Sequence, residues 1–452
     1  MNSIIKCSLL LAGVSLASFG VQAESTKAAT QTQAHHNAAA PKAAAAPEAK
    51  PTLATTAEAP SLKINGFSAY NIYAGKQNVR ENGKTFYSVH QAVDVSDIRF
   101  TITGVMTSGL EYKYRVNLQA IPGEDPLFNA NYISFKHWFG EVLFGNVVGP
   151  EDSYIKDAES LAGGTGGFNG GQFNVINKSV GVFTGNDISG DTNYATKIMW
   201  NSPEFGGIQI GVAFTPNTAR RGNDKMQNLS ASLNSAPGNS AAVWPYKLTR
   251  PYGLNNLALG IIYKNSYGDW RLTLSGAVVT EKSFYNDNDK GTTRIRLQDA
   301  KSYQLGFIIG YKNFQFGGGY LNNGKSRLPR EAITVNSVSN ALGDAHLGNA
   351  GEAFNVGGNY KKGAYVFGLS YQQTFRKTDA IRSAKGRFVS ASAEAAIAQG
   401  LAVYTEANFA DMKTNDVAIA THNRVKSALG QNDRQVRNNS AVTFITGVKM
   451  AF

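Results

Sequence analysis

The sequence predicts an all-β protein, a 16-stranded antiparallel transmembrane β-barrel. Three observations predict it. Apolar and polar residues alternate at period two in many segments between residues 61 and 452, and the connections between these segments alternate between short turns and long polar loops. The 452-residue chain also holds 47 Gly and 11% aromatic residues but only 17% charged residues, against ~25% charged residues in ordinary globular proteins. A mean hydropathy of −0.25 argues against a bundle of transmembrane helices.

The alternation is clearest near the start and at the end of the predicted barrel. Apolar side chains share one face at Leu110, Tyr112, Tyr114, Val116 and Leu118, and polar ones share the other at Glu111, Lys113, Arg115, Asn117 and Gln119. The last segment repeats the pattern from Val442 to Phe452. Because successive side chains of a strand point to opposite faces, each segment has an apolar side and a polar side.

Sixteen segments carry this signal. The predicted strands are 61–74, 92–104, 108–120, 129–138, 141–148, 192–202, 207–215, 255–265, 269–281, 300–312, 314–322, 352–361, 364–374, 387–398, 401–411 and 439–452. Seven short turns alternate strictly with eight long loops, and the long loops are expected at 75–91, 121–128, 149–191, 216–254, 282–299, 323–351, 375–386 and 412–438.

The unequal connections favour a membrane barrel over a soluble propeller or sandwich. In an up-and-down meander, all short turns lie at one end and all long loops at the other, as in outer-membrane barrels. Closing the sheet pairs every strand edge, which hydrocarbon requires because it offers no water to exposed peptide groups. A barrel of sixteen strands is too wide to fill with side chains, so an aqueous lumen is expected. Aromatic residues near many predicted strand ends, from Tyr70 and Tyr73 to Trp138 and Tyr365, suit the two interfacial girdles.

The N-terminal residues predict export. Residues 1–23 combine Lys6, an apolar stretch and small residues before position 24, as in a cleaved signal peptide. Residues 24–60 are rich in Ala, Pro and Thr and are expected to form a disordered spacer; a cell-wall tether is the alternative. The barrel domain is expected at 61–452. The one cysteine, Cys7, lies within the signal segment, so no disulfide is expected in the mature protein.

Three segments resemble the Gram-negative general porins. Residues 131–145 resemble the porin hairpin with its Phe-Gly turn, residues 193–207 resemble a second turn signature containing Ser-Pro, and the terminal residues 447–452 are similar to the signal that the outer-membrane assembly machinery recognises. In that signal the matching residues are Gly447, Met450 and Phe452. The resemblance implies a homotrimeric channel in the outer membrane whose third long loop folds inward and narrows the lumen.

The third long loop, 149–191, therefore predicts a constriction. Its acidic residues are Glu151, Asp152, Asp157 and Glu159, and a Gly-rich run follows at 163–171. The basic residues Arg99, Lys113 and Arg115 have the polar parity of the first strands, and Arg271 is a further candidate for the pore wall. Opposed acidic and basic groups across a narrow pore select solutes by charge. An ordinary solvated surface loop is the alternative.

Net charge bears on selectivity. The chain carries +12, of which Lys6 contributes +1 and residues 24–60 contribute zero from three Lys and three Glu, so residues 61–452 carry +11. Charge is costly on a lipid-facing surface, so this excess is expected in the lumen or loops, where it predicts a weak preference for anions. An alternative use is docking of lipid phosphates by a basic cluster around one long loop, namely Arg376, Lys377, Arg382, Lys385 and Arg387.

The predicted function is passive diffusion of small hydrophilic solutes and ions through a water-filled outer-membrane channel. The expected partners are outer-membrane lipid and lipopolysaccharide, the assembly machinery and other copies of the chain, and no nucleic acid. No cofactor, metal or enzymatic activity is expected, because the one histidine within a predicted strand, His137, lies near a short turn without an evident Ser or Asp partner. A solute-specific channel or a surface adhesin on the same barrel is the alternative.

Overall fold

The computed structural model describes residues 58–81, 84–119, 127–176, 187–218, 252–286, 294–328, 330, 348–377, 383–414 and 438–452. The chain divides into two units, Met1–Leu53 and Ala54–Phe452. The predicted signal peptide and nearly all of the predicted spacer lie outside the described residues. Within the described part of the chain, no helix is long and apolar enough to cross a membrane.

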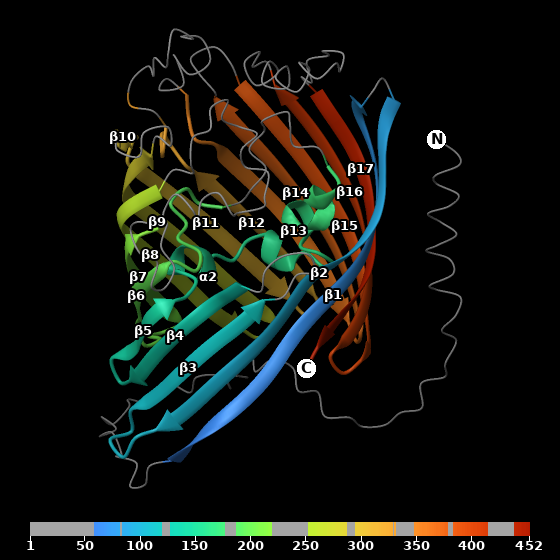
Figure 1. Ribbon diagram of the computed structural model, residues 1–452. Coiled ribbons are helices and arrows are strands. Elements are labelled where there is room, and N and C mark those ends of the chain that lie inside the picture. Colours follow the sequence, from blue (N-terminus) through green and yellow to red (C-terminus); the bar gives the residue numbers. More distant parts are fainter. Residues whose placement is uncertain are drawn as a thin grey trace, which may run out of the picture. The chain divides into compact units, whose positions relative to one another are not determined.

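The described residues of the second unit lie almost entirely in strands (Figure 1). They are β1 (Glu58–Glu81), β2 (Lys84–Val105), β3 (Glu111–Gln119), β4 (Leu127–His137), β5 (Gly140–Asn146), β6 (Thr196–Asn201), β7 (Ile208–Asn217), β8 (Tyr252–Tyr267), β9 (Trp270–Asn286), β10 (Arg294–Arg296), β11 (Ala300–Tyr311), β12 (Phe314–Asn322), β13 (Glu352–Lys362), β14 (Tyr365–Lys377), β15 (Ser383–Ala398), β16 (Leu401–Thr414) and β17 (Asn438–Ala451). Four short helical segments follow β5, namely α2 (Pro150–Ser153), η1 (Glu159–Leu161), η2 (Gly167–Asn169) and η3 (Gly171–Asn174).

The sheet closes on itself. Each strand runs antiparallel to its neighbours, and β1 pairs with both β2 and β17, with Phe67 opposite Ala451. Gly66 and Phe452 exchange backbone hydrogen bonds at 2.9 and 3.1 Å, which extends this seam to the last residue. The strand β10 has three residues and pairs with the end of β9 that extends past the β9–β11 pairing. It is therefore not a separate strand of the barrel wall. The prediction of a closed 16-stranded antiparallel β-barrel is confirmed.

Alternation decides which side chains face outward. In β8, Leu257, Leu259 and Ile261 are each 45–46% exposed, whereas the alternating Asn256 and Ala258 are fully buried. The same exposed apolar rows recur around the wall, for example Phe314 and Phe316 in β12 and Phe367 and Leu369 in β14. An outer apolar surface is the face that a lipid bilayer requires of a barrel.

Glycines make the short turns possible. Gly109, Gly268, Gly363 and Gly400 each have φ between +56° and +79°, a left-handed conformation that only glycine adopts without strain. At this end of the barrel, aromatic side chains pack in pairs across neighbouring strands, with ring centroids 4.7 Å apart for Trp270 and Tyr311 and 4.6 Å apart for Phe314 and Tyr360. Of the aromatic residues expected in the girdles, Tyr73 is an exception, because its side chain is fully buried among inward-facing residues.

The largest departure from the predicted strands is the first hairpin. Residues 75–91 were expected to form a long loop, but β1 continues to Glu81 and β2 begins at Lys84, with Gly75 opposite Ser88. The prediction is wrong because polar residues occupy both faces of this extension, so it has no apolar row from which a strand could be recognised. Backbone pairing between β1 and β2 forms this extension of the hairpin nonetheless.

Candidate functional site

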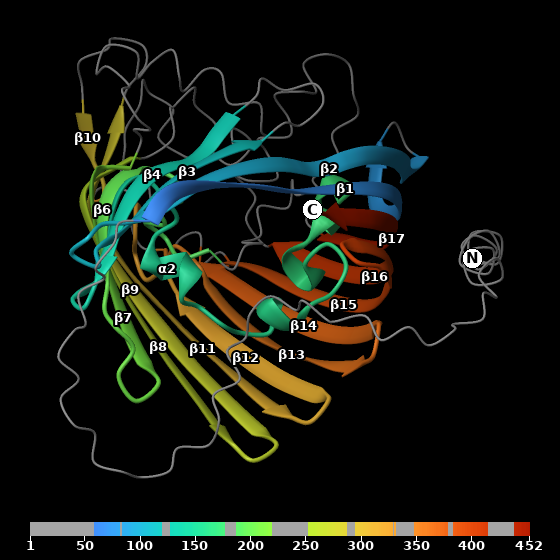
Figure 2. The ribbon, with the colours of Figure 1, turned by 90° about the horizontal axis from the view of Figure 1, so that it is seen from below.

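Residues 150–163 run across a series of wall glycines. A Cβ atom on Gly260 would lie 2.7 Å from the Pro150 carbonyl oxygen, and one on Gly306 would lie 2.4 Å from that of Lys156. Further along, a Cβ atom on Gly319 would lie 2.8 Å from Asp157 Cβ. Because Gly260 in β8, Gly306 in β11 and Gly319 in β12 have no side chain, the segment can lie directly against the wall at these positions. Figure 2 shows α2 and the green turns that follow it drawn within the ring of strands.

The Gly-rich run continues this packing with unusual backbone angles. Gly164, Gly166 and Gly167 have φ of +64°, +118° and +66°, values that favour glycine because it has no Cβ. A Cβ on Gly164 would also lie 2.5 Å from Glu406 Oε2. The Gly-rich run therefore lets the backbone of this segment pass close to β14, β15 and β16.

Hydrogen bonds hold the segment at several points. The Thr165 N–H and hydroxyl both donate to Glu406 Oε2 at 2.8 Å, and Ser390 Oγ donates to Glu406 Oε1 at 3.3 Å. Asn355 in β13 donates to Asp157 Oδ2 at 2.9 Å. Glu406 is 1% exposed, and a buried carboxylate is tolerated where several donors satisfy it.

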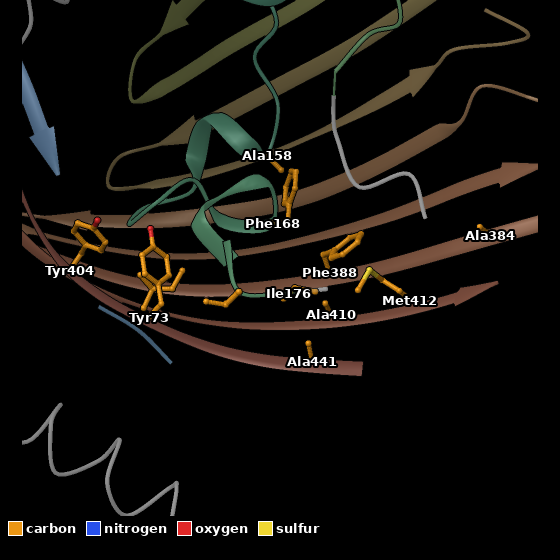
Figure 3. Close-up of a cluster of buried hydrophobic side chains, with 12 residues drawn as sticks. Tyr73, Ala158, Phe168, Ile176, Ala384, Phe388, Tyr404, Ala410, Met412 and Ala441 are labelled. Atoms are coloured by element: carbon orange, nitrogen blue, oxygen red, sulfur yellow. The ribbon is translucent and has the colours of Figure 1, made fainter. Parts of the chain in front are cut away.

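An apolar cluster fills the space between this segment and strands β15, β16, β17 and β1 (Figure 3). Phe168 and Ile176 pack with Phe388, Met412 and Tyr73, all of which are at most 5% exposed. Phe173 meets Phe388 edge-on with ring centroids 5.4 Å apart. We call the inner face of β7–β9 and β11–β17, against which residues 150–176 pack, the covered wall.

The four acidic residues predicted from the sequence have two different environments. Glu151 and Asp157 are 1% and 2% exposed; Glu151 Oε1 accepts hydrogen bonds from the Thr192 N–H at 3.1 Å and from the Thr192 hydroxyl at 2.6 Å. Asp152 is exposed and Glu159 is half-buried. Two of the four are therefore structural, and two remain open to solvent.

Two further carboxylates that sequence reasoning missed, Asp187 and Asp191, join these four around a pocket of about 310 Å³. Lys156 is the one basic side chain among the residues that line it. The pKa of Asp191 is raised to about 7, chiefly by burial and also by the charges of Glu151, Asp152 and Asp187, while a hydrogen bond from the Asn193 N–H acts to lower it. We call this group of six carboxylates the acidic pocket. Asp187 and Asp191 come after residues 177–186 in the chain, and their spacing from the first four carboxylates follows no pattern that would predict this pocket.

The predicted basic residues of the first strands do come together. Arg99 Nε lies 2.7 Å from Asp97 Oδ2, and Lys113 Nζ lies 2.8 Å from Glu141 Oε1. Arg115 Nε donates to Asn117 Oδ1 at 2.9 Å. Among the described residues, Arg115 has no carboxylate within 4.0 Å, so its charge is the least compensated of the three. We call the inner face of β2–β5, with these side chains, the charged wall.

The phenol of Tyr194 is influenced by charges of both the acidic pocket and the charged wall, and sequence reasoning missed this residue. Burial raises the pKa of its phenol; the charges of Asp97 and Asp152 raise it further, while those of Arg99 and Arg115 lower it. Charges of the acidic pocket (Asp152) and of the charged wall (Asp97, Arg99 and Arg115) thus both act on this phenol.

The other predicted site residues lie elsewhere. Arg271 is at the short-turn end of β9, where its guanidinium donates to the Lys312 carbonyl at 2.7 Å. Gly447 in β17 leaves no room for a Cβ, which would lie 2.7 Å from the Tyr404 ring, and Met450 and Phe452 are 48% and 62% exposed. In the part of the chain that is described, no group of three or more His, Cys, Asp or Glu residues is arranged to hold a metal ion.

Known proteins resemble this chain at the levels of family, sequence and fold. The profile of the Gram-negative porin family matches residues 34–415. An uncharacterized protein of Rickettsia conorii is 23% identical over 408 residues, which cover 79% of this chain and 88% of that protein. An uncharacterized protein of Rickettsia prowazekii is 22% identical over 395 residues, which cover 76% and 85%.

Solved structures share the architecture. The anion-selective porin from Comamonas acidovorans matches with a TM-score of 0.51 at 14% identity, over 87% of this chain and all of that one. OmpT from Vibrio cholerae in its trimer form gives a TM-score of 0.50 at 14% identity, with the same coverage. Salmonella typhi OmpF in complex with daunomycin gives 0.50 at 13% identity, over 86% of this chain and 97% of that one. At these identities the likeness shows the fold.

Proposed function

We propose, because this chain belongs to the Gram-negative porin family, that it is a passive outer-membrane channel for small hydrophilic solutes and ions. One observation carries the proposal: charged side chains line the inner face of β2–β5, while apolar side chains cover the outer face of the same barrel. A polar interior keeps water in the lumen, and an apolar exterior holds the barrel in the bilayer.

We further propose that residues 149–191 form the constriction. The wall glycines and the Glu406–Thr165 contacts support a fixed position for this segment. Asp152 and Glu159 would then oppose Arg99, Lys113 and Arg115 across the solute path, with Tyr194 between them. Opposed charges in a narrow passage orient the dipoles of solutes and water.

A weak preference for anions is the proposed selectivity. Residues 61–452 carry +11. Glu151 and Asp157 are buried and hydrogen-bonded, which reduces their influence on a passing ion, whereas Arg115 has no paired carboxylate among the described residues. The acidic pocket opposes this preference, which is why we expect it to be weak.

The assembled form we propose is a homotrimer, delivered to the outer membrane through a removed signal peptide at 1–23, with 24–60 as a spacer. The trimer form of Vibrio cholerae OmpT supports this assembly. The C-terminal residues Gly447, Met450 and Phe452 are proposed to serve recognition by the assembly machinery. We also propose that the channel has no enzymatic activity; His137 hydrogen-bonds the Ser108 carbonyl at 3.2 Å near a short turn.

The test is conductance of the purified full-length protein in planar bilayers, together with its mobility on native gels. We expect stepwise conductance that rises linearly with salt, a small reversal potential of anionic sign in a salt gradient, and a trimer band. Saturable block by one solute would instead favour a solute-specific channel. A protein that folds in lipid but conducts no ions would contradict the channel proposal.

A further inference from the structure

The chain packs against the wall directly after β12, although the sequence predicts a polar loop from residue 323 onward. Asn323, Ser326 and Leu328 are all buried. Arg327 has φ of +61°, a left-handed conformation that is uncommon for a residue with a side chain. Such a conformation persists only where the surrounding contacts fix it. We call residues 323–328 the strap.

Backbone and hydroxyl contacts tie one end of the strap to β11. The Arg327 N–H donates to the Gln298 carbonyl at 3.0 Å, and the Gln298 N–H donates to the Leu328 carbonyl at 2.7 Å. Ser326 Oγ accepts a hydrogen bond from the Lys301 N–H at 2.9 Å. Because Lys301 lies in β11 and Gln298 comes just before that strand, this end of the strap is held by the barrel wall.

An ion pair holds the strap to β9. Arg327 Nε lies 2.6 Å from Glu281 Oε1, and Ser283 Oγ donates to the same oxygen at 3.1 Å. The Glu281 side chain is fully buried, and a buried carboxylate without a partner is costly. Within the described residues, Arg327 supplies the one basic nitrogen within 4.0 Å of Glu281, so this contact strongly favours the observed position of the strap.

Asn323, the first residue of the strap, binds residues 187–191, the last part of the proposed constriction. The Ser189 N–H donates to Asn323 Oδ1 at 2.6 Å, and Asn323 Nδ2 donates to the Asp187 carbonyl at 3.5 Å. Ile188 belongs to the same buried apolar cluster as Leu321 of β12. One amide side chain therefore fixes the backbone on both sides of Ile188.

Asn256 in β8 connects the ion pair to the same five residues. Its amide nitrogen donates to the Gly190 carbonyl at 2.8 Å and to Glu281 Oε2 at 3.0 Å. Gly190 has φ of +95°, and a Cβ atom there would lie 2.7 Å from Val279 Cγ1. The strap thus holds residues 187–191 directly through Asn323 and indirectly through Glu281 and Asn256.

The residues held in this way carry two carboxylates of the acidic pocket, Asp187 and Asp191. In the described part of the chain, neither carboxylate has a basic nitrogen within 4.0 Å. Both lie close enough to Asp152 for their charges to interact. Like charges in one pocket repel one another, so Asp187 and Asp191 keep their places only if the backbone that carries them is restrained.

We propose that the strap fixes Asp187 and Asp191 beside the solute path, which makes Asn323 and the Arg327–Glu281 pair positioning residues for ion selection. The proposal rests on the channel function proposed above. Residues outside the path thereby set how strongly the acidic pocket opposes anions. Without the strap, the two carboxylates would move apart into water, where salt screens their effect on a passing ion.

The test measures hydrogen exchange and ion selectivity of the full-length protein. Asn323→Leu removes the acceptor of the Ser189 N–H; the control, Asn265→Leu, removes the Asn oxygen that accepts the Ser266 N–H at 2.7 Å at the short-turn end. We expect exchange in peptides that cover residues 187–191 to become about fivefold faster in Asn323→Leu, as for loss of one hydrogen bond, and to be unchanged in the control. The ratio of chloride to potassium permeability should rise only in Asn323→Leu.

A second pair of variants tests the ion pair. Arg327→Met removes the cation beside Glu281, so it should also speed exchange at residues 187–191 and raise the permeability ratio. Arg327→Lys keeps the charge and should restore most of the slow exchange and most of the original ratio, although it loses the planar guanidinium. Exchange in peptides of β14 and β16 reports whether the barrel itself stays folded.

Three outcomes would overturn the proposal. Unchanged exchange at residues 187–191 in both Asn323→Leu and Arg327→Met would show that the strap does not hold them. Equally faster exchange in β14 and β16 would mean a weakened barrel rather than release of one segment. Faster local exchange with an unchanged permeability ratio would leave the strap a structural role alone. A wild-type protein without conductance would instead refute the channel function, and the exchange measurements test the strap separately from it.

Discussion

The covered wall and the charged wall use the same residue types for opposite purposes. Where residues 150–176 pack on the covered wall, Glu406 and Asp157 are buried, and donors from Thr165 and Asn355 satisfy them. On the charged wall, Asp97 and Glu141 pair with Arg99 and Lys113 in partial contact with solvent. A carboxylate withdrawn from water and hydrogen-bonded supports structure, whereas one beside an aqueous path contributes to the field there.

The covered wall and the charged wall also differ in how many glycines face the barrel interior. The covered wall presents inward glycines on β7, β8, β11 and β12 where residues 150–157 pass them, and the small Ser275 on β9. The charged wall presents long side chains at the corresponding inward positions of β3. A backbone segment can lie against the first surface, while the second leaves charged groups extended toward solvent.

The largest expected effect comes from filling the glycine contact on the covered wall. Gly306→Val places a Cβ 2.4 Å from the Lys156 carbonyl oxygen, and overpacking of this kind costs about 1–3 kcal/mol. We expect residues 150–163 to move into the lumen and single-channel conductance to fall. The control is Gly276→Val on the outer face, where the atom nearest to the added Cβ is in the flexible Leu305 side chain at 3.2 Å and the nearest backbone atom is 3.7 Å away. Equal conductance in the two variants would refute the packing argument.

Removing the buried carboxylate comes next. Glu406→Ala leaves the two Thr165 donors without their acceptor, which should lower the free energy of unfolding by about 1–3 kcal/mol. Chemical denaturation followed by tryptophan fluorescence measures this change. Glu406→Gln keeps an acceptor oxygen and should lose less, and Glu394→Ala, whose ion pair with Lys449 is partly exposed, should cost no more than about 1 kcal/mol. A loss at Glu394 equal to that at Glu406 would contradict the distinction between buried and exposed carboxylates.

Charge reversal on the charged wall should change selectivity rather than stability. Arg115→Glu replaces the least compensated cation by an anion, and a unit charge at 4 Å in water is worth about 1 kcal/mol, or about fivefold in an ion's local concentration. The reversal potential in a salt gradient should therefore shift toward cation preference. Arg271→Glu, at the short-turn end of β9, should shift it much less; similar shifts would mean that only net charge matters.

The smallest expected effect is a change of ion selectivity with pH, caused by titration in the acidic pocket. Asp191 has a pKa of about 7, so it is neutral below that pH and negative above it. Raising the pH from 6 to 8 adds negative charge beside Glu151, Asp152 and Asp187, opposite Lys156, and should weaken anion preference with a midpoint near pH 7. Reversal potentials measured across this range test the shift. Asp191→Asn should flatten the response and Asp269→Asn, at a short turn, should not; an unchanged response in Asp191→Asn would locate the titrating group elsewhere.

Sequence reasoning succeeded where a local pattern was sufficient and failed where distant residues had to meet. The alternation in β8 or β16 identifies each strand and its outward face, because side-chain direction in a strand follows from parity alone. The β1–β2 hairpin was missed beyond residue 74, since polar residues at both parities remove the alternation there. Asp187, Asp191 and Tyr194 have no recognisable spacing to Asp152 and were not found.

The sequence by itself determined the number of strands, their order and the polarity of their two faces, because each of these depends on residues close together in the chain. Only the tertiary structure decided which carboxylates are buried and which wall glycines contact the segment after β5. Those properties depend on the register of the closed sheet and on where the segment after β5 meets it, as when Thr165 donates to Glu406 of β16. Register joins residues far apart in sequence, and no local periodicity records it.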